Sequence, residues 1–137
     1  MLYNLLMKKI LTTGLLLGFL LLVVSMLSSQ VFYFLFPGLK AEYENPNIFR
    51  PWTDPAMQLF FLHPFVLGII LTWLWHKVKG SFGNGLKFAL VYWFVTIPGM
   101  FISYSSFQIS PVMVLSWTVS GLLQSVVAGL YLGRVDR

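Results

Sequence analysis

Four long apolar runs separated by short polar segments dominate the hydrophobic pattern of this chain. The runs cover about residues 10–36, 55–77, 86–104 and 111–132. A helix that crosses a bilayer core needs about 20 apolar residues, and each run meets or approaches that length. Because helices satisfy all of their own backbone groups in lipid, the pattern predicts an all-α, polytopic membrane protein with a four-transmembrane-helix bundle.

Two of the runs begin with a helix-capping residue followed by proline. Asp54 precedes Pro55, and Ser110 precedes Pro111. The capping oxygen accepts a hydrogen bond from a first-turn amide, and proline has no amide to leave unpaired there. These pairs predict the starts of the second and fourth helices. Gly133 is placed to end the last helix.

The composition indicates a single membrane domain over residues 1–137. Hydrophobic residues make up 58% of the chain and charged residues only 9%, whereas a soluble domain carries about 25% charged residues. The net charge of +5 does not indicate nucleic-acid binding, because the basic residues stand at the ends of apolar runs, where lipid headgroups lie. The absence of cysteine excludes disulfides and thiolate metal sites.

The distribution of Lys and Arg predicts that both termini are cytoplasmic. Only Lys40 and Arg50 would then lie outside. The basic residues that would lie inside are Lys8, Lys9, Lys77, Lys79, Lys87, Arg134 and Arg137. Because cytoplasmic loops carry the excess of Lys and Arg, we expect a multi-pass, N-in/C-in protein of the plasma or inner membrane. The first run is longer than a signal-peptide core of about 15 residues, so we expect it to stay as a helix.

The one long connection, residues 37–54, is rich in proline and aromatic residues. We expect a stiff segment that rests at the headgroup interface, with Phe49 and Trp52 turned toward lipid. A lid or a partner-docking element is the alternative, because long loops are often functional. Arg50 could form an ion pair with Glu42, Glu44 or Asp54, which all lie in the same stretch.

Polar side chains recur at one depth in the outer half of the predicted helices. Ionisable groups inside a membrane are costly, so each is a functional hypothesis. His63 lies about 12 Å below the outer end of the second helix, at 1.5 Å per residue, and Pro64 and Pro98 predict kinks near this level. The candidate polar layer consists of His63, Ser29, Gln30, Thr96, Ser116 and Ser120.

This polar layer has two interpretations. It can line a small cavity that opens outward, or its members can simply bond between helices, at about 0.6 kcal/mol per contact and without any ligand. The sequence favours the second interpretation, because serine and threonine are common in membrane helices.

The spacing of His63 and His76 resembles that of paired haem ligands on one cytochrome b helix. On a straight helix, however, the two side chains point well apart, since successive residues turn by about 100°. We therefore expect no cofactor and no metal, with a tetrapyrrole held by His63 or His76 as an alternative.

Two stripes of small residues predict close helix packing. The first helix carries Gly14 and Gly18, and the fourth carries Gly121, Ser125 and Gly129 at four-residue spacing. Such stripes allow backbones to approach closely. They do not distinguish contacts within one chain from contacts between chains.

The stretches NPNIFRPWTDP, PGMFISYSSF and VLSWTVSGLLQSVVAG carry a resemblance to families of small uncharacterised bacterial and archaeal membrane proteins. The resemblance covers most of the chain, including the order of a long first helix, an aromatic outer loop and three tightly linked helices. Because these families have no established activity, it implies the fold and no functional residue.

The motifs of common enzymes are absent: the sequence holds no intramembrane carboxylate pair, no HExxH and no phosphate-binding loop. We therefore expect a non-enzymatic protein that acts by helix packing, as an accessory subunit of a membrane complex or as a homo-oligomer. The alternative is a carrier or channel for a small molecule or protons that uses the layer around His63. The expected partners are the lipid bilayer and a membrane protein or a second copy of the chain, with no nucleic acid.

Overall fold

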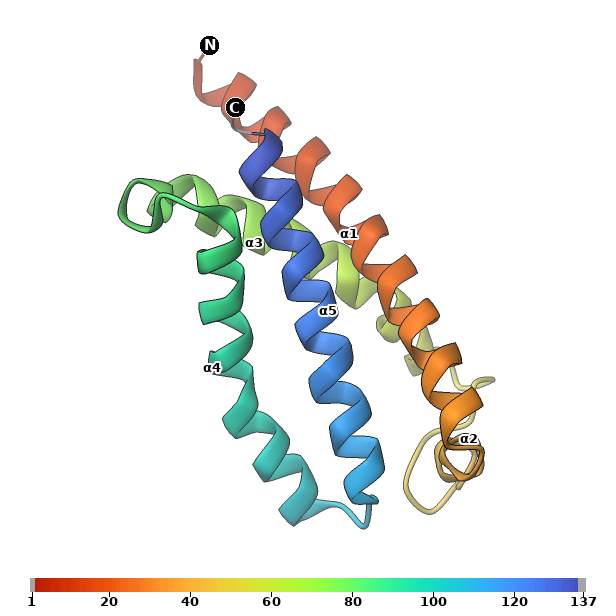
Figure 1. Cartoon of the computed structure of the whole chain (residues 1–137). Helices are drawn as coiled ribbons and strands as arrows, with labels where there is room; N and C mark the ends of the chain where they lie inside the picture. The colour runs from red at the N-terminus through yellow and green to blue at the C-terminus, as the bar shows by residue number, and fades with distance from the viewer. Residues whose placement is uncertain (1, 136–137) are drawn as a thin grey trace.

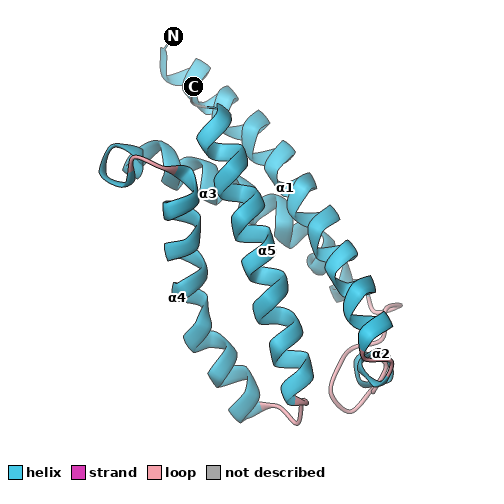
Figure 2. Cartoon of the chain, in the orientation of Figure 1, coloured by secondary structure: helices cyan, strands magenta, loops and turns pink. Residues whose placement is uncertain are grey.

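The structure, a computed structural model that describes residues 2–135, consists almost entirely of helices. Figure 2 shows only short loops between them. No strand is present within residues 2–135. Arg137, which the orientation prediction counts among the inner basic residues, lies outside this range. The elements in chain order are α1 (Leu2–Leu35), α2 (Gly38–Tyr43), the 3-10 turn η1 (Pro55–Met57), α3 (Gln58–Phe82), α4 (Gly85–Ser106) and α5 (Pro111–Val135).

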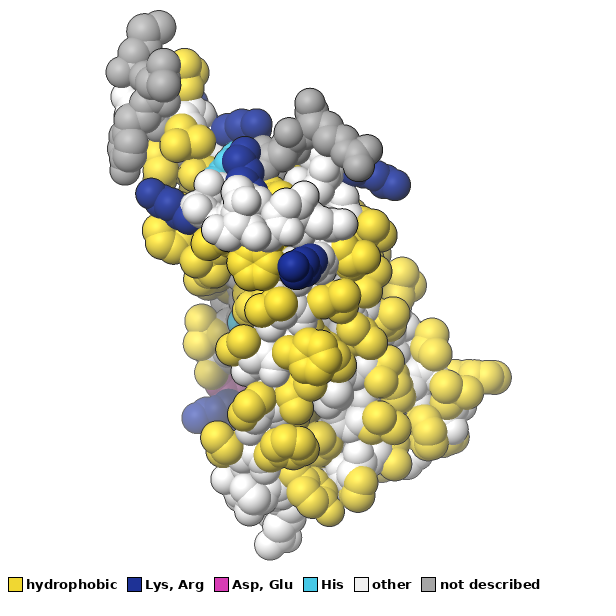
Figure 3. Space-filling model, turned by 60° about the vertical axis from the view of Figure 1, so that its left-hand side comes forward, with side chains coloured by type: hydrophobic (Ala, Val, Ile, Leu, Met, Phe, Trp, Pro, Cys, Tyr) yellow, Lys and Arg dark blue, Asp and Glu magenta, His cyan; other side chains and the backbone are white. Residues whose placement is uncertain are grey.

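Four of these helices are long and apolar enough to cross a membrane, which confirms the predicted all-α four-helix membrane bundle. The candidate spans are Asn4–Leu35, Pro55–Phe82, Gly85–Ser106 and Pro111–Val135. Large apolar side chains stay on the outside of the bundle, as Phe34 at 84% exposure shows. Figure 3 shows hydrophobic side chains over most of the visible surface. A surface of this kind suits contact with lipid and not with water.

The predicted helix starts are correct, and each has a capping bond. The Asp54 carboxylate accepts from the Ala56 amide at 2.8 Å, and the Ser110 hydroxyl accepts from the Met113 amide at 3.1 Å. Asn84 caps α4 in the same way. Gly83, with a φ of 65°, ends α3 in the left-handed conformation that glycine adopts without strain.

Several predicted boundaries differ from the structure, most of all the start of α1 and the ends of α3 and α5. α3 ends at Phe82 and not near residue 77. α1 starts at Leu2, well before residue 10, because no glycine or proline interrupts the helix there; its 34 residues span about 50 Å, more than the bilayer core. α5 continues through Gly133 to Val135. Gly133 faces the start of α4, where a Cβ would lie 3.7 Å from the Gly85 nitrogen, and it keeps a regular helical φ.

The four spans pack as two pairs joined through α1 and α5. α3 packs mainly on α1, α4 mainly on α5, and α1 and α5 contact each other, whereas α3 and α5 barely meet. Figure 1 shows α5 between α1 and α4, with α3 passing behind α5 and inclined to it. The first turns of α1 and the last turns of α5 lie at the same end of the molecule.

Glycine allows the closest helix contacts, and these lie within the chain. A Cβ on Gly68 of α3 would come within 2.3 Å of the Gly14 carbonyl oxygen and 2.5 Å of the Gly18 nitrogen. A Cβ on Gly85 would come within 2.5 Å of the Gly129 carbonyl oxygen. The stripes predicted from the sequence therefore join α1 to α3 and α5 to α4.

The remaining members of the α5 stripe pack less tightly. Gly121 faces the Trp93 side chain, which would lie 3.5 Å from an added Cβ. Ser125 is buried. Small side chains thus line the inner side of α5 along its length, without a backbone contact at every turn.

The apolar core fills the half of the bundle that holds the α3–α4 turn. Its buried members come from all four spans and are Leu17, Leu21, Leu71, Trp75, Phe88, Ala128 and Leu132. A second, smaller cluster of Leu39, Ile109 and Met113 lies at the opposite end, beneath α2. Between the two clusters the helices diverge, and this divergence leaves room for a cavity.

Candidate functional site

A cavity of about 670 Å³ lies in the half of the bundle beneath α2, between α1, α3 and α5. Its volume falls in the range of small-molecule sites, about 300–1,000 Å³. It brings together most of the predicted polar layer. The members that line it are His63, Ser29, Gln30, Ser116 and Ser120.

Thr96 does not belong to this cavity, so the prediction of a layer drawn from four helices was wrong at this position. Its hydroxyl donates to the Trp93 carbonyl at 2.7 Å, within its own helix. The physical reason is that α4 packs on the side of α5 that faces away from α1. Pro98 and Pro64 both lie inside continuous helices, and α4 changes direction partway along its length (Figure 1).

Most serine hydroxyls of the cavity are satisfied within the chain. Ser29 donates to the Ser25 carbonyl at 2.9 Å, and Ser116 donates to the Met113 carbonyl at 2.7 Å. The hydroxyls of Ser28 and Ser120 bond to each other and join α1 to α5. For these serines, the geometry fits the second interpretation of the polar layer, in which its members form hydrogen bonds within and between helices.

His63 and Gln30 differ from the serines. They line the same cavity from α3 and α1, and neither side chain has a hydrogen-bond partner among the described residues. Both side chains are exposed, so they are open to water or to a ligand. The hydroxyls of Ser25 and Tyr33 also line the cavity and likewise form no hydrogen bond with the described residues.

The position of His63 follows from the helix crossing beside it. Pro64, the next residue, is buried, and its carbonyl oxygen lies against Gly18. This contact holds α3 close to α1 just below the cavity. His63 itself stands at the point where the two helices begin to separate.

Aromatic side chains form the walls and rim of the cavity. Tyr43 packs edge-on against Tyr33 at 5.9 Å between ring centroids and lies 5.4 Å from Phe49. On the other side, Trp52 packs on Phe60 at 5.7 Å. Such ring pairs are stabilising by about 0.5–1.5 kcal/mol beyond their buried area, so they hold a defined shape around the cavity.

The outer segment, residues 37–54, covers the cavity and is not a structureless loop. It begins with α2. Phe49 packs edge-on against Trp117 of α5, 6.4 Å away, so the prediction that it turns toward lipid was wrong: its ring is drawn to the aromatic cluster. Trp52 is 54% exposed at the rim of the cavity.

Two contacts fasten the outer segment to the start of α5. The Glu42 carboxylate accepts from the Ser110 amide at 2.5 Å and from the Ser110 hydroxyl at 2.6 Å. The Trp117 indole donates to the Tyr43 hydroxyl. Burial raises the pKa of Tyr43 above its ordinary value, against the opposing effect of the Trp117 bond. A carboxylate is favoured at a helix start, where unpaired amides and the helix dipole attract it.

Arg50 pairs with Asp54, one of its expected partners, at 2.8 Å. The Ala56 amide, and after it the Arg50 guanidinium, lower the pKa of Asp54. The pair lies where the outer segment enters η1, so it fixes the entry to α3.

Several cavity residues were not singled out from the sequence, although a signal was present. Gln124 lines the cavity, and its amide donates to the Ser120 carbonyl at 3.3 Å. Ser116, Ser120 and Gln124 follow one another at four-residue spacing, which puts them on one face of a helix. Tyr33, Tyr43 and Trp117 had no comparable pattern.

The two histidines do not share a site. His63 lines the cavity, whereas His76 lies further along α3 and outside it. Within residues 2–135, no group of three or more His, Asp or Glu side chains could hold a metal ion. A tetrapyrrole would therefore depend on one of these histidines alone in each chain.

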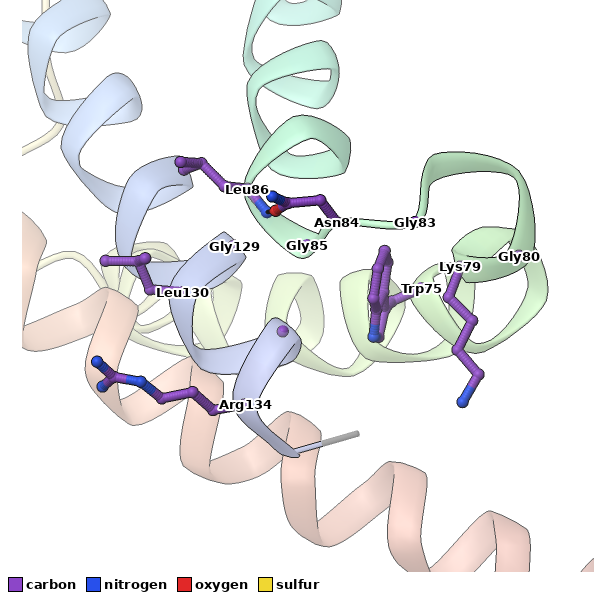
Figure 4. Close-up of a pocket in the computed structure, with 11 residues that line it drawn as sticks. Trp75, Lys79, Gly80, Gly83, Asn84, Gly85, Leu86, Gly129, Leu130 and Arg134 are labelled. Carbon is purple, nitrogen blue, oxygen red and sulfur yellow. Dashed lines mark hydrogen bonds between the residues drawn. The ribbon is translucent and has the colours of Figure 1, made fainter. Parts of the chain in front are cut away.

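A second cavity, of about 660 Å³, lies at the α3–α4 turn beside the end of α5. Figure 4 shows that the side chains of Lys79 and Arg134 extend to opposite sides of it. The Trp75 indole nitrogen nearby is buried and has no hydrogen-bond partner in the described part of the chain. Because the two basic groups diverge, they do not form a joint anion site.

The cavity beneath α2 is thus the better-built candidate, with a defined roof, aromatic walls and polar groups, among them His63 and Gln30, that form no hydrogen bond with the described residues. Comparison of the chain with protein-family models, with curated proteins and with solved structures finds no match.

Proposed function

We propose that this chain is a non-enzymatic, multi-pass protein of the cell membrane that binds or carries a small molecule in the cavity around His63. The observation that supports this is that His63 on α3 and Gln30 on α1 line the same cavity, both without partners among the described residues. Inside a membrane, such groups are costly unless a ligand or water satisfies them.

The proposal includes an orientation with both termini in the cytoplasm. Lys and Arg gather toward the end that holds the first turns of α1 and the last turns of α5, as Figure 3 illustrates. An excess of these residues on one side is typical of the cytoplasmic side. The cavity and its aromatic roof would then face the outer half of the membrane.

The accessory-subunit or homo-oligomer function expected from the sequence stays a prediction. Its main support was the stripes of small residues, and Gly14, Gly18 and Gly129 are engaged in contacts within the chain. They therefore give no separate reason to expect a contact with another chain.

The proposed function can be tested by purifying the protein from its native membrane in a mild detergent and identifying bound small molecules by mass spectrometry. We expect a molecule near one per chain in the wild type and its loss from a His63→Ala/Gln30→Ala variant. His76→Ala, a change of the same kind outside the cavity, should retain it. The proposal would be overturned if the folded wild-type protein carries no small molecule, or only molecules that the double variant carries as well. A co-purified protein would support the accessory-subunit alternative.

A further inference from the structure

The cavity beneath α2 has no charged group on its walls. Its lining, drawn entirely from described residues, contains no Asp, Glu, Lys or Arg. The polar groups that face it are hydroxyls, amides and the imidazole of His63.

The charges that stand near the cavity are already paired with one another or with the protein. Arg50 bonds Asp54 at 2.8 Å. Glu42 accepts two bonds from Ser110. These groups stay partnered on the outer segment, so an ion that entered the cavity would lose its hydration without gaining an opposite charge.

The side chains of His63 and Gln30 favour a head that both accepts and donates hydrogen bonds. The Gln30 amide offers two N–H donors and a carbonyl acceptor, and a neutral imidazole offers one donor and one acceptor. A hydroxyl, ester or carbonyl group matches this set. The remaining walls are aromatic and aliphatic, including Phe60 and Phe61 at the rim, and suit an apolar chain or ring.

We infer that the ligand of this cavity is an uncharged amphiphile, with a hydroxyl-, ester- or carbonyl-bearing head that hydrogen-bonds to polar groups of the lining, His63 or Gln30 among them, and an apolar body against the aromatic walls. This inference rests on the proposed function and narrows it to one chemical class. The exposed aromatic rim beside Trp52 gives such a molecule a route from the surrounding lipid.

The inference can be tested with three dibrominated amphiphiles that share one acyl chain and differ in the charge of the head. They are a monoacylglycerol (uncharged), a lysophosphatidylglycerol (anionic) and an acylcholine (cationic). The full chain is placed in phosphatidylcholine nanodiscs, and quenching of tryptophan fluorescence is measured, because Trp52 and Trp117 both line the cavity.

We expect saturable quenching by the monoacylglycerol, with half-saturation at least about tenfold below that of either charged probe. His63→Ala/Gln30→Ala should raise its half-saturation by about tenfold or more, as the loss of one or two hydrogen bonds predicts, and His76→Ala should leave it unchanged. Since neither His63 nor Gln30 has a hydrogen-bond partner in the described chain, the double variant should keep the helical circular dichroism of the wild type.

Two results would overturn the inference, and they differ in what they say of the proposed function. If a charged probe binds as tightly as the uncharged one, and the double variant abolishes that binding, the cavity is a binding site but its ligand class is not uncharged. If no probe gives saturable quenching that depends on His63 and Gln30, neither the ligand class nor the binding of a small amphiphile stands.

Discussion

Both carboxylate oxygens of Glu42 accept hydrogen bonds from Ser110, one from its amide at 2.5 Å and one from its hydroxyl at 2.6 Å. Ser110 also caps α5 through the Met113 amide. One residue therefore ends the α4–α5 connection, starts α5 and anchors the outer segment. The roof of the cavity is held to the bundle by this contact and by the Trp117–Tyr43 bond.

Glu42→Ala should release α2 from the start of α5. Hydrogen bonds to a charged group contribute about 1.5–3 kcal/mol, so amides of residues 38–43 should exchange at least about tenfold faster in a hydrogen–deuterium measurement. Glu44→Ala is the matched control, because its pair with Lys40, at 4.0 Å, is exposed and of little energetic value. Equal exchange in the two variants would contradict the role assigned to Glu42.

The bond between Ser28 and Ser120 should couple α1 to α5 weakly. Hydrogen bonds between membrane helices average about 0.6 kcal/mol and reach about 1.7 kcal/mol. A double-mutant cycle with Ser28→Ala and Ser120→Ala, followed by unfolding in mixed detergent, should give a coupling energy in that range. A coupling indistinguishable from zero would show that the two hydroxyls do not stabilise the bundle together.

The helices themselves could be predicted from the sequence because their physical cause is local. Length, hydropathy and the caps at Asp54 and Ser110 depend on neighbouring residues. Gly14 and Gly18 could be predicted as packing residues for the same reason. Their partner, Gly68, could not, because a single glycine on α3 gives no pattern and its role depends on how two helices cross.

The cavity could be predicted only in part. In a straight helix, the number of residues from the helix end gives the depth of a side chain in the membrane. This depth predicted that His63, Gln30 and the serines lie at one level. The exclusion of Thr96 depends on the rotation and order of the helices, since α4 packs on the far side of α5. The roof of the cavity could not be predicted, because it depends on a contact between Glu42 and Ser110, which are 68 residues apart in sequence. Neither residue has a local sequence pattern that indicates this contact.

Gly68→Ala should destabilise the bundle strongly. The added Cβ would meet the Gly14 carbonyl oxygen at 2.3 Å, and a backbone atom can yield only if the helices separate. Overpacking of this kind typically costs about 1–3 kcal/mol and occasionally more. The midpoint of thermal unfolding in detergent should fall well below that of the wild type.

Gly99→Ala is the control for that substitution. Gly99 also lies inside a helix, but nothing within 4 Å would meet an added Cβ. Replacing a helical glycine there should leave the midpoint unchanged or raise it, since alanine favours a helix by about 0.5–1 kcal/mol. The opposite ranking of the two variants would argue against the α1–α3 crossing.

The proposed orientation can be tested with introduced cysteines, because the chain has none of its own. Asn47→Cys and Gln108→Cys lie in connections at the end of the bundle that holds α2, and Ser81→Cys lies near the α3–α4 turn; all three native side chains are exposed. If the excess of Lys and Arg marks the cytoplasmic side, a membrane-impermeant maleimide added to intact cells should label positions 47 and 108. Position 81 should react only after the membrane is permeabilised. Labelling of position 81 alone in intact cells would invert the orientation and place the cavity in the inner half of the membrane, where its ligand would have to come from the cytoplasmic leaflet.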